Sequence, residues 1–163
     1  MDLDYLTIFK ELNKQKIDYL VVGGLAVNFH GIPRMTYDID LMILLDPLNI
    51  RRMVLRLLDW GYRPGVPVNP EDLADEVIRT SWIKEKGMRA LNFYHESQPI
   101  GAIDLVIDLP ISYDQLRERA IIIELQGEKI PVVSIHDLIK LKMKAGRKQD
   151  LSDVEHLKKI LEI

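Results

Sequence analysis

Two short apolar runs between residues 19 and 43 are each interrupted by residues that a simple buried strand would not contain. The first run, YLVV, ends directly at Gly23 and Gly24. The second run begins with DID, so that Asp38 and Asp40 stand on either side of one isoleucine. β-Rich residues that stop at a glycine pair predict a strand followed by a tight turn and a short helix. This segment therefore predicts a strand–helix–strand unit with two carboxylates at the start of its second strand.

The second strand, expected over residues 38–45, has an uneven distribution of polar side chains. Side chains alternate between the two faces of a strand, which places Asp38 and Asp40 on one face together with Met42 and Leu44. A face in contact with solvent would stay polar along its length, so we expect the strand to be buried on both faces with the carboxylates at its mouth. The alternative is that Asp38 caps a loop and Asp40 faces water at a strand end.

Two carboxylates on one face of a strand lie about 7 Å apart at their Cα atoms. At that separation each raises the pKa of the other, unless a cation lies between them. A hard divalent ion such as Mg²⁺ or Mn²⁺ takes oxygen ligands and keeps coordination positions open for phosphates. The glycine turn adds backbone N–H groups that favour anions. The pattern thus favours a site for a metal and a phosphate.

Mixed strands and helices follow one another through the rest of the chain. We expect an α+β fold in which a mixed, twisted β-sheet is flanked by helices and followed by a C-terminal helical pair. The expectation is a single domain over 1–163, with an α+β core at 1–133 and the helical pair at 134–163. The expected helices are 3–15, 25–30, 47–60, 134–146 and 150–161. The expected strands are 17–22, 38–45, 78–84, 88–95, 103–109 and two around Gln126-Gly127, with 78–84 and 88–95 forming a hairpin at Lys86-Gly87.

Composition narrows the class of protein. The chain has 163 residues, of which 47% are hydrophobic and 29% charged, so a packed core is expected rather than disorder. A net charge of −3 restricts any nucleic-acid site to a local patch. The absence of cysteine removes disulfides and thiolate metal sites. No apolar run approaches the length of a membrane span, and we expect a cytoplasmic protein.

The spacing of these residues also resembles a known superfamily. Residues 22–41 read as a hydrophobic residue, Gly-Gly, thirteen residues, Asp, a hydrophobic residue, Asp and a hydrophobic residue. This resembles the signature of the polymerase-β-like nucleotidyltransferases. The stretch VVGGLAVNFHGIPRMTYDIDLMI, together with the C-terminal DLIKLKMKAGRKQDLSDVEHL, is similar to the AbiEii/MenA-type members, which are toxins of bacterial toxin–antitoxin pairs. The resemblance implies transfer of a nucleoside monophosphate from an NTP, with two Mg²⁺ ions held by three carboxylates.

The third carboxylate of the superfamily lies on a later strand of the same sheet. The candidate here is Asp104 in GAIDLVIDLP, where it interrupts a strand that is apolar on both faces. Asp108 is the alternative, although its place before Leu109-Pro110 favours a turn or cap. The resemblance assigns Asp38, Asp40 and Asp104 as metal ligands and catalytic residues. It also makes Asp104 a candidate acceptor of the proton from the attacking hydroxyl.

A basic segment at 140–148 supplies candidate phosphate ligands. On a helical wheel Lys142 falls within the apolar stripe, so its ammonium group needs a partner. A triphosphate or a carboxylate would serve; otherwise the group reaches water at the end of its aliphatic stem. The resemblance places a phosphate-contacting lysine in this helix. The full set of nucleotide-binding candidates is Gly23, Gly24, Arg34, Lys142 and Arg147, with Thr36 and Asp150 as supporting residues.

Three functions remain open at this level. The first is nucleotidyl transfer to RNA, for which the tRNA 3′ end is the precedent, in a toxin–antitoxin-like context with an antitoxin partner. The second is modification of a protein or of a small molecule such as an aminoglycoside. The third is a non-catalytic role in binding a nucleotide or a partner. A basic groove with aromatic residues would favour RNA, whereas an acidic cleft would favour a cationic small molecule.

Overall fold

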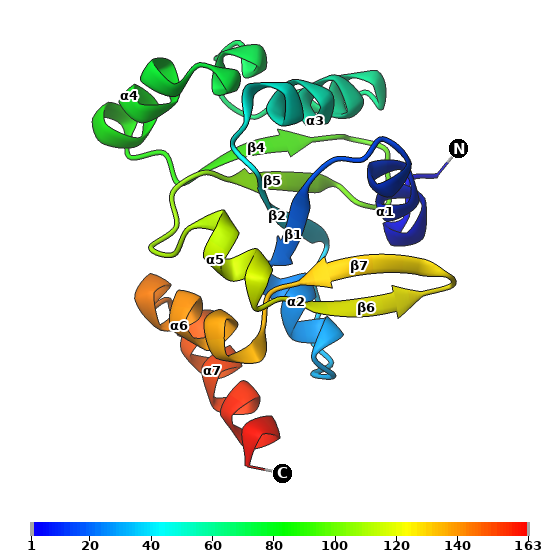
Figure 1. The fold of residues 1–163 in the computed structure, drawn as a ribbon, viewed down its shortest axis with the longest axis vertical. Coiled ribbons are helices and arrows are strands. Elements are labelled where there is room, and N and C mark those ends of the chain that lie inside the picture. Colours follow the sequence, from blue (N-terminus) through cyan, green and yellow to red (C-terminus); the bar gives the residue numbers. More distant parts are fainter. Residues whose placement is uncertain (1, 163) are drawn as a thin grey trace.

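The computed structural model describes residues 2–162 and contains a seven-stranded mixed sheet with helices around it (Figure 1). The strands are β1 (Tyr19–Val22), β2 (Asp38–Ile43), β3 (Arg63–Pro64), β4 (Ala90–Tyr94), β5 (Ala102–Val106), β6 (Ile121–Leu125) and β7 (Glu128–Val132). The helices are α1 (Tyr5–Lys14), α2 (Gly23–Phe29), α3 (Pro47–Asp59), the 3₁₀ helix η1 (Pro70–Ala74), α4 (Glu76–Lys86), α5 (Tyr113–Glu118), α6 (Ile135–Ala145) and α7 (Lys148–Leu161). The expected α+β class with a C-terminal helical pair is confirmed.

The strand order places β2 at the centre of the sheet. The order is β3-β4-β5-β2-β1-β7-β6, with β2 parallel to β5 and antiparallel to β1. The face of β2 that carries Ile39, Leu41 and Ile43 is fully buried. Helices α5, α6 and α7 lie on the opposite side of the molecule from α3 and α4 (Figure 1). The other face of β2 is buried at Met42 and half-buried at Asp40, while Asp38 at its start is exposed.

Local capping explains where several helices begin and end. Asp46 accepts a hydrogen bond from the backbone N–H of Asn49, and Pro47 occupies the first turn of α3, the position that proline favours. Gly61 follows this helix with φ +92. Ser134 caps α6 in the same way, and Gly146 ends α6 in the left-handed conformation. Serine or aspartate at the start of a helix and glycine after its end satisfy backbone groups that the helix leaves unpaired.

The strand expected at 78–84 is wrong, and so is the hairpin at Lys86-Gly87. This segment belongs to α4, which Asp75 begins by accepting hydrogen bonds from two backbone N–H groups. Gly87, with φ +64, ends the helix instead of forming a hairpin turn. The β-branched and aromatic residues favoured a strand, but the cap and the packing of Trp82 on the core outweigh that weak propensity.

Other boundaries shift by a few residues. Helix α2 begins at Gly23 itself, so the glycine pair lies within its first turn and no separate turn precedes the helix. Helix α7 begins at Lys148, which makes Asp150 its third residue and Arg147 its N-cap. The hairpin at Gln126-Gly127 forms between β6 and β7, with positive φ at both residues.

Candidate active site

Strand register brings the three candidate carboxylates to one edge of the sheet. Asp38 pairs with Ala102 and Asp40 pairs with Asp104 across the parallel β2–β5 ladder. Asp38 is exposed at the strand end, whereas Asp40 and Asp104 are half-buried. Asp108 lies beyond the end of β5 and is exposed. Of the two candidates for the third carboxylate, the structure therefore places Asp104 beside Asp40.

The clustering has an electrostatic cost. Burial, followed by the charge and hydrogen bonding of Asp104, raises the pKa of Asp40 to about 7, while Lys142 opposes the rise. Burial and the Asp104 charge also raise the pKa of Asp38. Neighbouring carboxylates disfavour each other's ionised form. The protein's own cations therefore do not neutralise the negative charge of these clustered carboxylates.

Gly23 makes close approach of α2 to Asp40 feasible. Its φ is +67, and a β-carbon at this position would collide with the Asp40 carboxylate. Only glycine meets both conditions without strain. At Gly24, a β-carbon would meet the guanidinium group at the flexible end of the Arg34 side chain. The glycine pair thus accommodates one carboxylate and one cation within the first turn of α2.

Asn92 is a site residue that the sequence patterns did not single out. It pairs with Asp104 across the β4–β5 ladder, and its side-chain N–H donates a short hydrogen bond to Asp104 Oδ1. No sequence pattern marks this contact, because one asparagine within ALNFY also fits an ordinary exposed strand position.

Lys142 is buried, with 6% of its surface exposed, and it contacts two carboxylates of α7. Its Nζ lies 2.9 Å from Asp153 Oδ2 and 3.4 Å from Asp150 Oδ1. The approach to Asp153 is an ion pair without hydrogen-bond geometry, since that oxygen has no hydrogen-bond partner among the described residues. Of the partners considered for Lys142, carboxylates therefore hold its ammonium group in this structure.

Two arginines complete this charged cluster. Arg147 Nε donates to Asp150 Oδ2 at 2.7 Å, while most of the Arg147 side chain is exposed. Burial pushes the pKa of Asp150 upward, but the hydrogen bond from Arg147 and the charge of Lys142 outweigh it and lower the pKa overall. Arg34 Nε lies 3.5 Å from Asp153 Oδ1. Asp150 therefore forms salt bridges with both Lys142 and Arg147.

Thr36 supports the entry to β2. Its hydroxyl donates to the backbone carbonyl of Asp38 at 3.4 Å, and its own carbonyl accepts from the Tyr5 hydroxyl at 3.3 Å. Next to it, Met35 and Tyr37 are 74% and 64% exposed. Hydrogen bonds to backbone carbonyls therefore hold the loop before Asp38 in place, while the Met35 and Tyr37 side chains extend into solvent.

The donor set fits a hard divalent ion, although the ligands are not yet gathered around one point. Within residues 2–162, no group of three or more His, Cys, Asp or Glu side chains is positioned to hold a metal ion. Asp40 and Asp104 are nonetheless adjacent, and Asp38 is near enough to Asp104 for that charge to affect its pKa. Oxygen donors with unbalanced negative charge are the ligands that Mg²⁺ and Mn²⁺ prefer. The expected Mg²⁺ or Mn²⁺ ions therefore stay a prediction.

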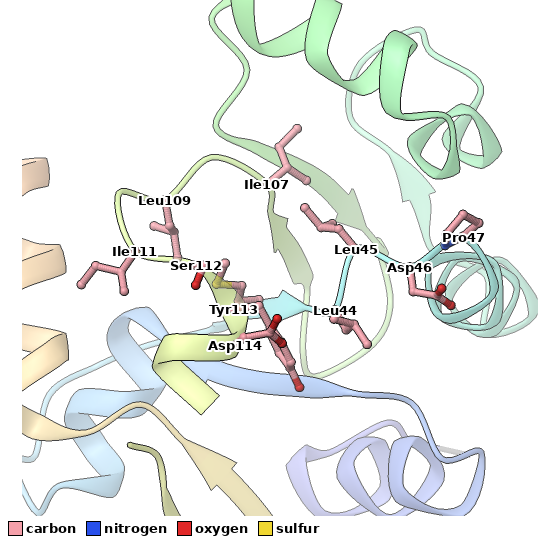
Figure 2. A pocket seen from close by; sticks show the side chains of 11 residues that line it. Leu44, Leu45, Asp46, Pro47, Ile107, Leu109, Ile111, Ser112, Tyr113 and Asp114 are labelled. Atoms are coloured by element: carbon pink, nitrogen blue, oxygen red, sulfur yellow. The ribbon is translucent and has the colours of Figure 1, made fainter. Parts of the chain in front are cut away.

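A cavity of about 530 Å³ lies beyond the other end of β2 and β5. Figure 2 shows Leu109 and Ile111 on one side of it and Leu45 and Asp46 on the other. Its remaining lining residues are Met42, Leu44, Pro47, Ile107, Ser112, Tyr113 and Asp114. The cavity is therefore mostly apolar, with carboxylates and hydroxyls as its polar groups.

A family model identifies the chain as a nucleotidyltransferase. The chain belongs to the family described as "Nucleotidyltransferase of unknown function (DUF6036)", whose model matches residues 4–162. This confirms the nucleotidyltransferase resemblance found in the sequence. A search of curated proteins gave no match.

Solved structures support the same fold. The lincosamide antibiotic adenylyltransferase LnuA, solved with lincomycin bound, is 18% identical, with 98% of this chain and 99% of that chain covered and a TM-score of 0.65. A candidate nucleotidyltransferase from Thermotoga maritima is also 18% identical, with 97% and 92% covered and a TM-score of 0.56. An antigenic nucleotidyltransferase-like protein from Paracoccidioides brasiliensis is 16% identical, with 95% and 72% covered and a TM-score of 0.54. At these identities the likeness concerns the fold alone.

Within residues 2–162, none of the helices is both long enough and apolar enough to cross a bilayer.

Proposed function

We propose that the chain transfers a nucleoside monophosphate from an NTP to a hydroxyl acceptor and releases pyrophosphate. The observation that carries this proposal is the pairing of Asp40 with Asp104 on adjacent parallel strands, next to Gly23. The family membership supports the reaction class, and the expected ions are two Mg²⁺ or Mn²⁺.

The ion-binding residues of the proposal are Asp38, Asp40 and Asp104. When bound there, divalent ions supply neutralisation of triphosphate charge and a lower pKa for the attacking hydroxyl. Asp104 has a second role as acceptor of the hydroxyl proton. The Asn92 hydrogen bond holds the Asp104 side chain in one orientation for this role.

Nucleotide phosphates would be bound by the cations on the α2 and α6 side of the carboxylates. Gly23 and Gly24 allow the backbone to approach, and Arg34, Lys142 and Arg147 are the proposed charged ligands. Phosphate oxygens would compete with Asp150 and Asp153 for Lys142, because both carboxylates contact its ammonium group. Thr36 and Asp150 would act by positioning Asp38 and the two C-terminal cations.

Two classes of acceptor are supported by different observations. The first class is RNA, for which the sequence resemblance supplies the tRNA 3′ end and a toxin–antitoxin setting as precedents. Exposed Tyr37 and Met35 beside the carboxylates favour it, because aromatic side chains stack on bases. A small-molecule acceptor is favoured by the acidic, apolar cavity and by the fold it shares with an antibiotic adenylyltransferase. A protein acceptor and an antitoxin partner remain proposals of the resemblance alone.

Label transfer tests the proposal directly. The protein is incubated with Mg²⁺ and each α-labelled NTP in separate reactions that contain tRNA, host protein lysate or amine-bearing small molecules. We expect label on one acceptor class, and we expect Asp40→Asn to abolish it. Label transfer by Asp40→Asn at the wild-type rate would exclude the proposed site, and absence of label with every acceptor would favour a role in binding.

A further inference from the structure

The apolar cavity lies on the strands that carry the candidate catalytic carboxylates. Met42 lines the cavity and pairs with Val106, and this pair is one same-face position beyond the Asp40–Asp104 pair. Such a step along a strand covers about 7 Å. A molecule held by Met42 and Leu44 would therefore lie within one to two such steps of the carboxylates.

The walls of the cavity are suited to a hydrocarbon body. Leucine, isoleucine, methionine and proline side chains make up most of the lining, and a volume of about 530 Å³ is in the usual range for a small-molecule site. Apolar surface buried in such a cavity gains free energy in proportion to its area.

The charged side chains that line the cavity are all acidic, and the Arg117 guanidinium interacts with the lining residue Tyr113 from outside the lining. The ionisable carboxylates of the cavity are Asp46 and Asp114, and none of the described residues that line it has a basic side chain. Asp46 is exposed and caps α3 by accepting a hydrogen bond from Asn49, and Asp114 is exposed in the first turn of α5. An anionic ligand would be repelled here, whereas an ammonium group would find partners.

We propose that this cavity binds the acceptor, and that the acceptor is a small amphiphilic cation with an apolar body, a basic amine and a hydroxyl. This inference rests on the proposed function. The acceptor oxygen forms a bond to the α-phosphorus while the bond from that phosphorus to the bridging oxygen of the β-phosphate breaks. The electron pair of the broken bond leaves with pyrophosphate, and the hydroxyl proton passes to Asp104.

Binding can be tested without any nucleotide or metal. Three probes share one hydrocarbon chain and one hydroxyl but differ in charge: aminooctanol, octanediol and hydroxyoctanoate. Methyl-labelled methionine gives a local NMR signal, because Met42 lines the cavity while Met53 is buried outside its lining and Met143 is exposed on α6. The Met42 signal is assigned from a Met42→Leu variant.

We expect aminooctanol to shift the Met42 signal and to bind several-fold more tightly than octanediol, with hydroxyoctanoate the weakest. Asp114→Asn should weaken aminooctanol several-fold and leave octanediol unchanged. Glu76→Gln is the matched control, because Glu76 is also an exposed acid in the first turn of a helix, away from the cavity. Equal binding of all three probes, or shifts at Met53 or Met143 without Met42, would overturn the proposal.

The acceptor role is then tested by label transfer to aminooctanol. Transfer that weakens in Asp114→Asn and not in Glu76→Gln supports it. Label on RNA but not on bound aminooctanol would overturn the acceptor assignment and leave the proposed function standing. Binding of aminooctanol with no transfer to any acceptor would overturn both the acceptor role of the cavity and the proposed nucleotidyl transfer. The cavity would then be a cation-selective binding site.

Discussion

Among single residues, Asp40 links the stability of the fold most directly to the chemistry of the site. It is half-buried next to Asp104, and burial is the first cause of its raised pKa. The Asp40 carboxylate therefore makes the metal-free protein less stable at neutral pH than a neutral side chain at the same position would.

Asp40→Asn should stabilise the metal-free protein, and the gain should grow with pH. The folded-state pKa of Asp40 is about 7, above its ordinary value of 3.8. Its contribution is therefore greatest below the ordinary pKa and is lost as pH rises through about 7. Thermal unfolding in chelator should show a Tm gain of a few degrees at about pH 8 and a smaller gain at about pH 5. An equal gain at both pH values, or a similar gain in Asp108→Asn, would contradict this account.

Asn92→Leu should weaken divalent-ion binding while the fold persists. The variant keeps the side-chain size but removes the hydrogen bond that orients Asp104. Loss of a group that orients a metal ligand typically costs about 10-fold or more in metal affinity. Mn²⁺ titration followed by electron paramagnetic resonance measures this without any substrate, and Asn92→Gln serves as the conservative comparison. Unchanged Mn²⁺ affinity in Asn92→Leu would remove Asn92 from the site.

Among elements, the junction between β1 and α2 determines how closely the helix approaches β2. Gly23 and Gly31 both have positive φ, at +67 and +96, but only Gly23 has the Asp40 carboxylate where a β-carbon would lie. Gly31 has open space there. Alanine variants of the two glycines therefore distinguish the cost of backbone strain from the effect of displacing the Asp40 carboxylate.

Gly23→Ala and Gly31→Ala should carry a similar backbone cost, about 1–2 kcal/mol. Only Gly23→Ala should also move Asp40 and weaken Mn²⁺ binding and nucleotidyl transfer. Urea unfolding and Mn²⁺ titration of both variants measure the two effects separately. If Gly31→Ala loses ion binding as fully as Gly23→Ala, the effect comes from strain and the assigned role of Gly23 is wrong.

The pairing of α6 with α7 depends on Lys142. Lys142→Met should destabilise the protein by about 3 kcal/mol, because it leaves buried Asp150 and Asp153 without that cation. Lys144→Met, an exposed lysine of the same helix, should change stability little. Adding Asp153→Leu to Lys142→Met should recover part of the loss, and urea unfolding of the four proteins tests this. No difference between Lys142→Met and Lys144→Met would show that the ion pairs do not hold the helices together.

Most helices and strands could be predicted from the sequence, because the capping residues and the spacing of apolar residues in each segment indicate the same kind of element. The alternation in DIDLMI was enough to place Asp38 and Asp40 on one face, and a second interrupted strand pointed to Asp104. The segment at 78–84 failed because its β-branched residues carried more weight than Asp75 and Gly87, which fix a helix. Asn92 was missed because its contact depends on the register of β4 with β5, which single-strand patterns do not encode.

In the whole molecule, the sheet places two kinds of surface at opposite ends of the same strands. Carboxylates and the α6–α7 cations lie near the start of β2, and the apolar cavity lies near its end. The division into a core at 1–133 and a helical pair at 134–163 stays a prediction. The arrangement is consistent with a nucleotide at one end and an acceptor approaching from the other.

The most direct measurement compares Asp104→Asn with Asp108→Asn in label transfer from an NTP. Both replace an aspartate of the GAIDLVIDLP segment, but only Asp104 lies beside Asp40. We predict that Asp104→Asn reduces transfer by more than about 100-fold, whereas Asp108→Asn retains the wild-type rate. Wild-type transfer by Asp104→Asn, or an equal loss in Asp108→Asn, would contradict the claim that the β2–β5 carboxylates form the active site.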